Sequence, residues 1–347
     1  MKVAFLKKMF MIALVSSALL SCSSSEETIL QTSKTYDRHD FAKGADVSWL
    51  TQMEAAGYKF YNENGRESEC LSLLRDMGVN AIRLRVWVNP ADGWCNPQDV
   101  LVKAIRAQNL GLRLMIDFHY SDTWADPGSQ TVPAAWKEDG LEQLKQDVAD
   151  HTKAVLQSLK DHGVDSVKWV QVGNETSSGM LWPVGQASAG NTGNFSQLVT
   201  AGYDAVKSVY PATKVIIHID EGNNLDRYTW LLDSMKKDGA KWDVIGMSLY
   251  PDADHWKQET EDCLSNIKTL HERYGSEVMI CETGVSWDAD YADSFMTQLV
   301  TGAAAVKDCL GVFYWEPECY GGWQGYTKGA FDNSGKPTQA LDVFKTK

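Results

Sequence analysis

The stretches Asn80–Val88 (NAIRLRVWV) and Leu112–His119 (LRLMIDFH) decide the expected fold. Each is a short apolar run that ends in polar or aromatic residues, which is typical of a buried strand. Between them, Gln98–Gln108 is amphipathic and is predicted to form a helix. A strand, a helix and a second strand in this order indicate two parallel strands joined by a right-handed crossover.

The same unit recurs along the rest of the chain. Further strand-like runs are Gly44–Ser48, Val167–Gly173, Lys214–Asp220, Asp243–Tyr250, Val278–Cys281 and Gly311–Trp315. Further helix candidates are Ser68–Met77, Leu141–His162, Ser196–Val209, Leu225–Lys237, Glu259–Tyr274, Asp290–Val306 and Pro337–Phe344. Helix stops are expected at Gly78, Gly111, Gly163 and Gly239.

Eight such units predict the α/β class and, within it, a single (β/α)₈ TIM barrel. A doubly wound open sheet is the alternative architecture. The first strand is not followed by a glycine-rich phosphate fingerprint, which argues against that alternative.

The charge balance excludes one class of partner. The 347 residues include 33 Lys+Arg and 46 Asp+Glu, giving a formal net charge of −13. A nucleic-acid binder needs a basic face, so no nucleic-acid partner is expected. The 13 Trp point instead to flat, neutral ligands such as sugars.

The N-terminus is predicted to be an export signal. Three lysines within residues 1–8 precede the apolar run Met9–Leu20, which is too short to span a bilayer. The junction Leu19–Cys22 (LLSC) resembles a bacterial lipobox, which implies that Cys22 is lipidated. The polar run Ser23–Glu27 resembles the export signal of surface lipoproteins. We therefore expect a signal peptide at 1–21, a lipidated tether at 22–40 and a catalytic barrel at 41–347, on the outer-membrane cell surface.

The other six cysteines are Cys70, Cys95, Cys263, Cys281, Cys309 and Cys319. Their spacing matches no metal-binding pattern such as C-x-x-C. An even number in an exported protein permits disulfides. We expect mostly buried thiols, with one bridge allowed.

Polar side chains gather where the predicted strands end, the end that carries the active site in a barrel. They are Asp46, Arg83, Arg85, Asp117, His119, Asn174, Glu175, His218, Asp220, Tyr250, Glu282, Trp315 and Glu316. Glu175 and Glu282 follow the fourth and seventh strands, so they can face each other about 5–5.5 Å apart, as retaining glycoside hydrolysis requires. A structural role in buried ion pairs is the alternative.

Several segments together resemble glycoside hydrolase family 53, over roughly residues 41–345. They are Arg83–Pro90 (RLRVWVNP), Asp117–Gly128 (DFHYSDTWADPG), Val172–Glu175 (VGNE), His218–Gly222, Ser248–Pro251 (SLYP), Cys281–Gly284 (CETG) and Phe313–Pro317 (FYWEP). The resemblance implies a retaining clan-A barrel that cleaves β-1,4-galactosidic bonds in arabinogalactan by an endo mode. It implies no required cofactor.

The resemblance also implies a role for each matching residue. Glu175 would be the acid/base, Glu282 the nucleophile and Asn174 the ligand of the sugar 2-hydroxyl. Arg83 would keep the nucleophile ionised, and Tyr250 would donate to it. Further residues would contact the substrate: His119, His218 and Trp315 around the cleaved sugar, and Trp124 and Asp126 in the strand-three loop.

Two more assignments stay open at this point. Trp182 and Trp323 are predicted to stack on sugars in outer subsites, with ordinary packing as the alternative. Asp288, Asp290 and Asp293 could ligate a structural calcium, although an acidic helix start explains them as well.

We expect a monomer whose partners are galactan and, through its lipid, a membrane. The alternatives are another clan-A β-glycanase, of the mannanase or cellulase type, and a surface lipoprotein that binds glycans without cleaving them. The presence of both glutamates with Asn174, Arg83 and Tyr250 favours an enzyme.

Overall fold

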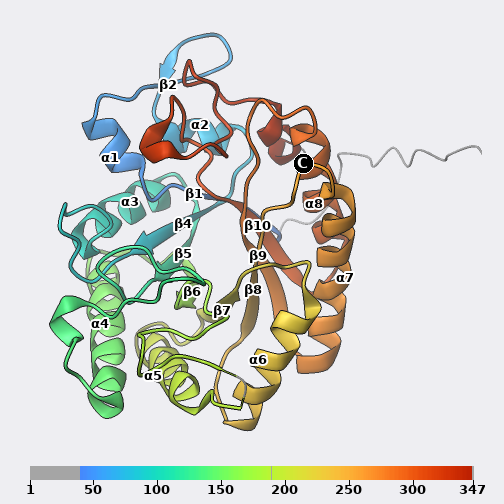
Figure 1. The fold of residues 1–347 in the computed structure, drawn as a ribbon. Helices are drawn as coiled ribbons and strands as arrows, with labels where there is room; N and C mark the ends of the chain where they lie inside the picture. The colour runs from blue at the N-terminus through green and yellow to red at the C-terminus, as the bar shows by residue number, and fades with distance from the viewer. Residues whose placement is uncertain (1–39, 189, 346–347) are drawn as a thin grey trace, which may run out of the picture. The chain divides into compact units, whose positions relative to one another are not determined.

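Eight parallel strands close into a barrel in the computed structural model, which describes residues 40–188 and 190–345 (Figure 1). Around the barrel the strands follow the order β1, β10, β9, β8, β7, β6, β5 and β4, and β4 pairs with β1 again. Their bounds are β1 Ala42–Asp46, β4 Ala81–Val86, β5 Arg113–Phe118, β6 Val167–Val172, β7 Lys214–Ile219, β8 Val244–Leu249, β9 Glu277–Thr283 and β10 Cys309–Tyr314. The predicted single (β/α)₈ barrel is confirmed.

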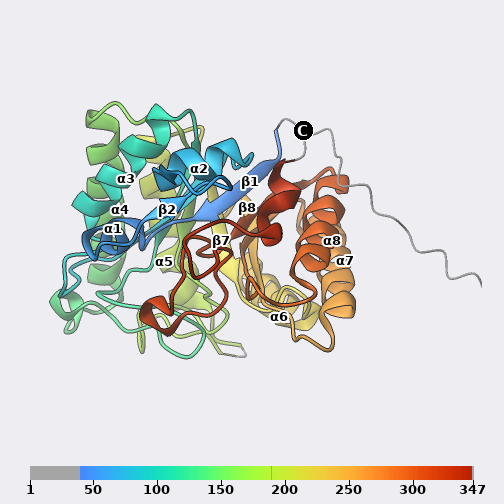
Figure 2. The same cartoon turned by 90° about the horizontal axis from the view of Figure 1, so that it is seen from above.

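Helices enclose the strands, as Figure 2 shows from above. Their bounds are α1 Leu50–Ala55, α2 Cys70–Asp76, α3 Pro97–Asn109, α4 Leu141–Asp161, α5 Gly193–Val209, α6 Leu225–Lys237, α7 Trp256–Tyr274 and α8 Ala292–Ala305. The expected stops are confirmed at Gly78, Gly111, Gly163 and Gly239, each of which has a positive φ just beyond a helix. Among the described residues, no helix has the length and apolar character needed to cross a membrane.

Strand β4 shows how the sequence pattern sorts side chains between two compartments. Ile82, Leu84 and Val86 pack in the large core between the strands and the helices. The alternate residues Arg83 and Arg85 face the barrel interior and are almost completely buried. Below them a small core fills the barrel: Ala42, Ala81, Met115, Trp169, Ile216, Val244, Met279, Cys281 and Phe313.

Two parts of the chain depart from the expected pattern. Between β1 and β4 the chain forms α1 and a hairpin of two-residue strands, β2 (Phe60–Tyr61) and β3 (Glu67–Ser68). Such strands are too short to show a periodicity in sequence. The last expected helix, Pro337–Phe344, is wrong, because this segment forms the 3₁₀ helix η3 (Gln339–Lys345).

The six described cysteines are all buried and all free, so the bridge that we allowed does not form among them. Other expected boundaries differ from the observed ones by a few residues, as when α7 begins three residues before the predicted start at Glu259. These differences leave the ends of the strands, and therefore the site, in place.

Candidate active site

One buried arginine joins three carboxylates at the centre of the barrel mouth. Arg83 Nη1 lies 2.7 Å from Asp46 Oδ2, and its Nη2 lies 2.9 Å from Asp117 Oδ2 and 2.7 Å from Glu282 Oε1. These side chains come from β4, β1, β5 and β9, so barrel closure is what brings them together. A buried guanidinium that is paired and hydrogen-bonded in this way stays charged, and its charge lowers the pKa of Asp117 and of Glu282.

Glu282 is held through both of its carboxylate oxygens. Its Oε1 accepts from Arg83, and its Oε2 accepts from the Tyr250 hydroxyl at 3.1 Å. Burial raises the pKa of Glu282 to about 7, an effect that Arg83 and Tyr250 oppose and that Asp117 and Asp46 reinforce. The carboxylate is therefore fixed in orientation, and its charged form is favoured by two hydrogen bonds.

Glu175 lies in a different electrostatic environment. It follows β6 with a positive φ of 45°, after Gly173 with a φ of 83°, and this sharp turn presents it at the barrel mouth. Burial and then the charge of Glu282 raise the pKa of Glu175 to about 8. Glu282 has an ion pair with Arg83, and Glu175 has none with any described residue. This difference favours a protonated Glu175 beside a charged Glu282, as an acid and a nucleophile require.

Asn174 is locked in one orientation beside Glu175. Its Oδ1 accepts from Arg83 Nη2 at 2.9 Å and from Gln171 Nε2 at 3.0 Å. Its Nδ2 donates to Ala125 O at 2.8 Å, which leaves one amide hydrogen for a ligand. Sequence reasoning did not single out Gln171, although its place in β6, at the alternate position before Gly173, points it into the barrel.

His218 supports this group from behind. Its Nε2 lies 2.9 Å from Ser248 Oγ, and its Nδ1 lies 2.8 Å from Gln171 Nε2 and 3.0 Å from Asn174 Oδ1. Burial lowers the pKa of His218 well below its usual value, so the ring is neutral. The prediction that His218 lines the cleaved-sugar subsite is wrong, because the residue is fully buried behind Asn174.

His119 does face the cavity, and its neighbours assign its tautomer. Its Nδ1 accepts from Trp87 Nε1 and from Ala125 N, both at 3.2 Å. The other nitrogen, Nε2, lies 3.0 Å from Asp117 Oδ2 and therefore carries the hydrogen. Burial lowers the pKa of His119 although Asp117 opposes this, so His119 is a neutral, fixed part of the wall.

A second buried arginine organises an aromatic wall. The Arg85 guanidinium carbon lies 4.1 Å from the ring centroid of Trp124, 4.8 Å from that of Trp87 and 5.4 Å from that of Trp49. Glu316 fixes it by accepting from Arg85 Nη1 at 2.9 Å and from Trp49 N at 2.7 Å. Sequence reasoning missed Trp49, although it lies three residues after β1.

These residues surround a cavity of about 290 Å³. The predicted residues that line it are His119, Trp124, Asp126, Asn174, Glu175, Tyr250, Glu282 and Trp315. Tyr326 and Lys328 also line it, and no sequence pattern pointed to either, because they lie in an irregular segment after β10.

Two further cavities adjoin the first and give the cleft unlike ends. One of about 390 Å³ shares Trp124 and Tyr326 with it and is lined also by Trp49 and Trp87. The other, of about 380 Å³, shares Glu175 and Tyr250 with it. The acidic residues lining this second neighbour, besides Glu175, are Asp220, Glu221, Asp252 and Glu259. One end is therefore aromatic and the other is acidic.

The two predicted outer tryptophans lie elsewhere. Trp323 is only 8% exposed and packs edge-on against Tyr58, with 5.1 Å between ring centroids. It lines none of these three cavities, and its stacking on a sugar in an outer subsite stays a prediction, with ordinary packing as the alternative. Trp182 is half-buried, donates to Ser178 O at 2.9 Å and also lies outside these cavities.

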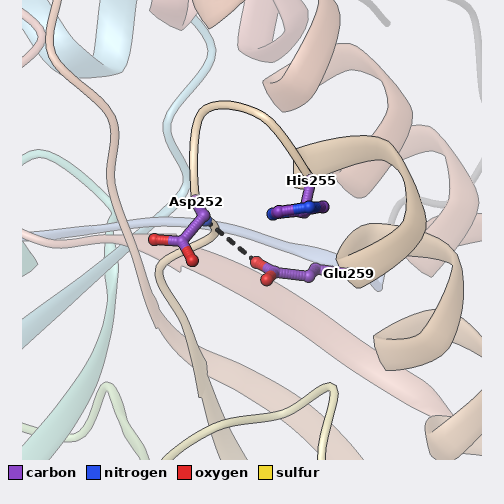
Figure 3. A group of neighbouring side chains, drawn as sticks. All are labelled: Asp252, His255 and Glu259. Carbon is purple, nitrogen blue, oxygen red and sulfur yellow. Dashed lines mark hydrogen bonds between the residues drawn. The ribbon is translucent and has the colours of Figure 1, made fainter.

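Two groups of described residues bring metal-ligating atoms within 4.8 Å of one another. In the first, the side chains of Asp252, His255 and Glu259 lie together at the start of α7, where the Asp252 amide donates to Glu259 Oε2 at 2.9 Å (Figure 3). The second consists of Glu316, Glu318 and Cys319, all buried.

The acidic stretch considered for calcium belongs to neither group. Asp288 accepts from Ser286 Oγ at 2.5 Å, and Asp293 lies in the first turn of α8. Asp290 is exposed beside them. This arrangement is that of a helix start with favourable N-terminal charge.

Known proteins share both the sequence and this fold. Residues 42–344 match the pattern of Glycosyl hydrolase family 53. The chain is 33% identical over 312 residues to an endo-β-1,4-galactanase of Bacillus subtilis (strain 168), covering 80% of this chain and 70% of that protein. It is 33% identical over 300 residues to an arabinogalactan endo-β-1,4-galactanase of Humicola insolens, covering 79% and 89%.

A solved fungal β-1,4-galactanase structure superposes with a TM-score of 0.80 at 30% identity, covering 88% of this chain and 98% of that one. The strand-end glutamates, the barrel and the sequence pattern thus agree, and the chain belongs to glycosyl hydrolase family 53.

Proposed function

We propose that this protein hydrolyses internal β-1,4-galactosidic bonds of (arabino)galactan with retention of configuration. The observation that carries the proposal is one cavity in which Glu282, fixed by Arg83 and Tyr250, shares space with the more weakly acidic Glu175. The names of the similar galactanases support galactan as the substrate.

In the first step a Glu282 oxygen attacks the anomeric carbon while Glu175 gives its proton to the departing glycosidic oxygen. The C1–O bond breaks, a C1–O bond to Glu282 forms, and Glu175 is left as a carboxylate. The raised pKa of Glu175 favours the protonated form that this step consumes.

In the second step the Glu175 carboxylate takes a proton from water, whose oxygen attacks C1 and releases Glu282. Glu175 recovers its proton and the anomeric configuration is restored by the second inversion. The free amide hydrogen of Asn174 is available to the 2-hydroxyl of the sugar at C1, an interaction that strengthens in the transition state.

The three adjoining cavities give room for sugars on both sides of the cleaved bond, which supports endo action. We further propose that the reaction needs no cofactor or metal, because the described residues supply the acid, the nucleophile and their charge partners themselves. A monomer suffices for the same reason.

The localisation is a separate proposal that rests on sequence. We infer that Cys22 carries a lipid that anchors the exported protein at the outer-membrane cell surface; Cys22 lies outside the described residues.

The substrate proposal predicts that the purified protein releases short oligosaccharides from linear β-1,4-galactan. Mannan and cellulose, assayed beside it, should release none. Product analysis by chromatography is the measurement. Cleavage of mannan or cellulose with galactan left intact would replace this proposal with that of another β-glycanase.

The two glutamates should respond differently to replacement by alanine. Both variants should lose at least about a hundredfold in turnover on galactan, the size typical of removing a proton-transfer group. With an activated aryl galactoside and azide, Glu175→Ala should give a glycosyl azide of retained configuration, and Glu282→Ala one of inverted configuration. The configurations are read by NMR.

A matched control is Glu142→Ala, because the Glu142 side chain is 81% exposed and remote in sequence from the strand ends. It should keep wild-type turnover. Swapped azide configurations would exchange the two roles, and undiminished turnover of both variants would show that neither residue is catalytic.

The anchor is tested by fractionating cells that express the native chain. The wild-type protein should sediment with membranes, and Cys22→Ala should appear as soluble, active enzyme. A Cys22→Ala protein that stays in the membrane fraction would contradict the lipid assignment. The control is Cys70→Ala, which alters a buried thiol and should leave the protein with the membranes.

A further inference from the structure

Lys328 lines the catalytic cavity but has no part in the mechanism described above. Its Nζ lies 4.6 Å from the centroid of the Tyr250 ring, the same tyrosine that donates to Glu282. The side chain is half-buried, and among the described residues that line this cavity it is the one lysine or arginine. An ammonium group is therefore held where the substrate must lie.

The backbone around Lys328 is fixed on both sides. The Tyr314 hydroxyl donates to Lys328 O at 3.0 Å, and the Tyr326 hydroxyl donates to Trp315 O. Next to Lys328, a Cβ on Gly329 would lie 1.9 Å from Cys319 O, so the chain passes too closely there for any other residue. The backbone position of Lys328 therefore follows from packing, and its ammonium lies over the Tyr250 ring.

Within residues 40–188 and 190–345, the Lys328 ammonium has neither a hydrogen bond nor an ion pair with a protein group. By contrast, the half-buried Lys207 is paired with Asp243 at 2.6 Å. Burial lowers the pKa of Lys328, and the nearby charge of Asp252 opposes this without contact within 4.0 Å. Three donors thus face the cavity without an acceptor.

The other ionisable residues that line the cavity in the described part of the chain supply no positive charge for a ligand. The charge of Glu282 is compensated by Arg83, and Glu175 holds its proton before the reaction begins. Asp126 accepts from the Gly128 amide at 2.7 Å. The Lys328 ammonium is consequently the positive group that a bound glycan meets.

A glycan that fills the cavity displaces the water around this ammonium, which must then find an acceptor. Sugar hydroxyls are weak, neutral acceptors that an amide side chain would serve as well. A carboxylate forms the shorter and stronger charge-assisted bond that repays dehydration of an ammonium.

We propose that Lys328 binds a carboxylate carried by the glycan near the cleaved bond, so that the substrates include galactans bearing uronic acid units. The proposal rests on the proposed galactanase function and narrows its substrate class.

The test uses β-1,4-galactotetraose and its counterparts in which one galactosyl unit carries a C6 carboxylate in place of the C6 hydroxyl. For at least one position of the carboxylate, Lys328→Met should lower kcat/KM about tenfold more for the acidic than for the neutral tetrasaccharide, the size expected of one charge-assisted bond. Lys328→Arg should keep the wild-type ratio of kcat/KM for the acidic to kcat/KM for the neutral tetrasaccharide, because it keeps the charge.

The matched control is Lys307→Met, which removes the same charge from an exposed position just before β10, at the opposite end of the strands. It should leave the ratio of kcat/KM for the acidic to the neutral tetrasaccharide unchanged.

Equal losses of kcat/KM on acidic and neutral tetrasaccharides, at every position of the carboxylate, would overturn the proposal and make Lys328 a ligand of hydroxyls. Wild-type rejection of every acidic tetrasaccharide would overturn it too. Failure of the wild type on the neutral tetrasaccharide and on galactan would instead refute the proposed function.

Discussion

The buried guanidinium of Arg83 is the constraint on which the catalytic centre depends. It lies between the side chains of Asp46, Asp117 and Glu282, and its positive charge lowers the pKa of Asp117 and of Glu282. The environment of Glu282 therefore depends on barrel closure, because Glu282, Arg83, Asp46 and Asp117 come from four different strands. Removing the guanidinium would leave uncompensated charge in the interior, a far larger change than the loss of one surface ion pair.

The orientations of neighbouring side chains also depend on the two arginines of β4. Arg83 fixes the oxygen of Asn174, so the amide nitrogen is turned to the side from which substrate enters. Two residues farther along β4, the guanidinium of Arg85 makes cation–π contacts with the rings of Trp49, Trp87 and Trp124. One strand thus supplies both the electrostatic support of the reaction and the scaffold of the aromatic wall, because alternate residues share a face.

The sequence predicted the barrel because the strand and helix periodicities alternate without interruption from β4 onward. It predicted that Glu175 and Glu282 lie in the active site, because the C-terminal ends of all the barrel strands lie at the same rim. Asp126 and Trp124 were likewise found through the segment after β5, and they do line the cavity.

The remaining misses have physical causes. Sequence position alone cannot tell a residue that lines the cavity from one that supports it, and His218 proved to be the second kind. Sequence position also cannot tell whether an aromatic residue after a strand turns toward a sugar or toward a neighbouring ring, and Trp323 packs against Tyr58. Lys328 and Tyr326 reach the cavity through an irregular segment whose path depends on close contacts such as that of Gly329 with Cys319.

The central claim, that Arg83 and Tyr250 lower the pKa of Glu282 against the effect of its burial, is tested most directly by the pH dependence of kcat/KM for Tyr250→Phe. Activity requires charged Glu282 and protonated Glu175, so it falls on the acid side as Glu282 gains a proton and on the alkaline side as Glu175 loses one. The tyrosine hydroxyl lowers the pKa of Glu282, so its removal should move the acid limb to higher pH, by about one unit for a single hydrogen bond to a charged group. The alkaline limb should move less. An acid limb that stays in place, or that moves to lower pH, would contradict the account.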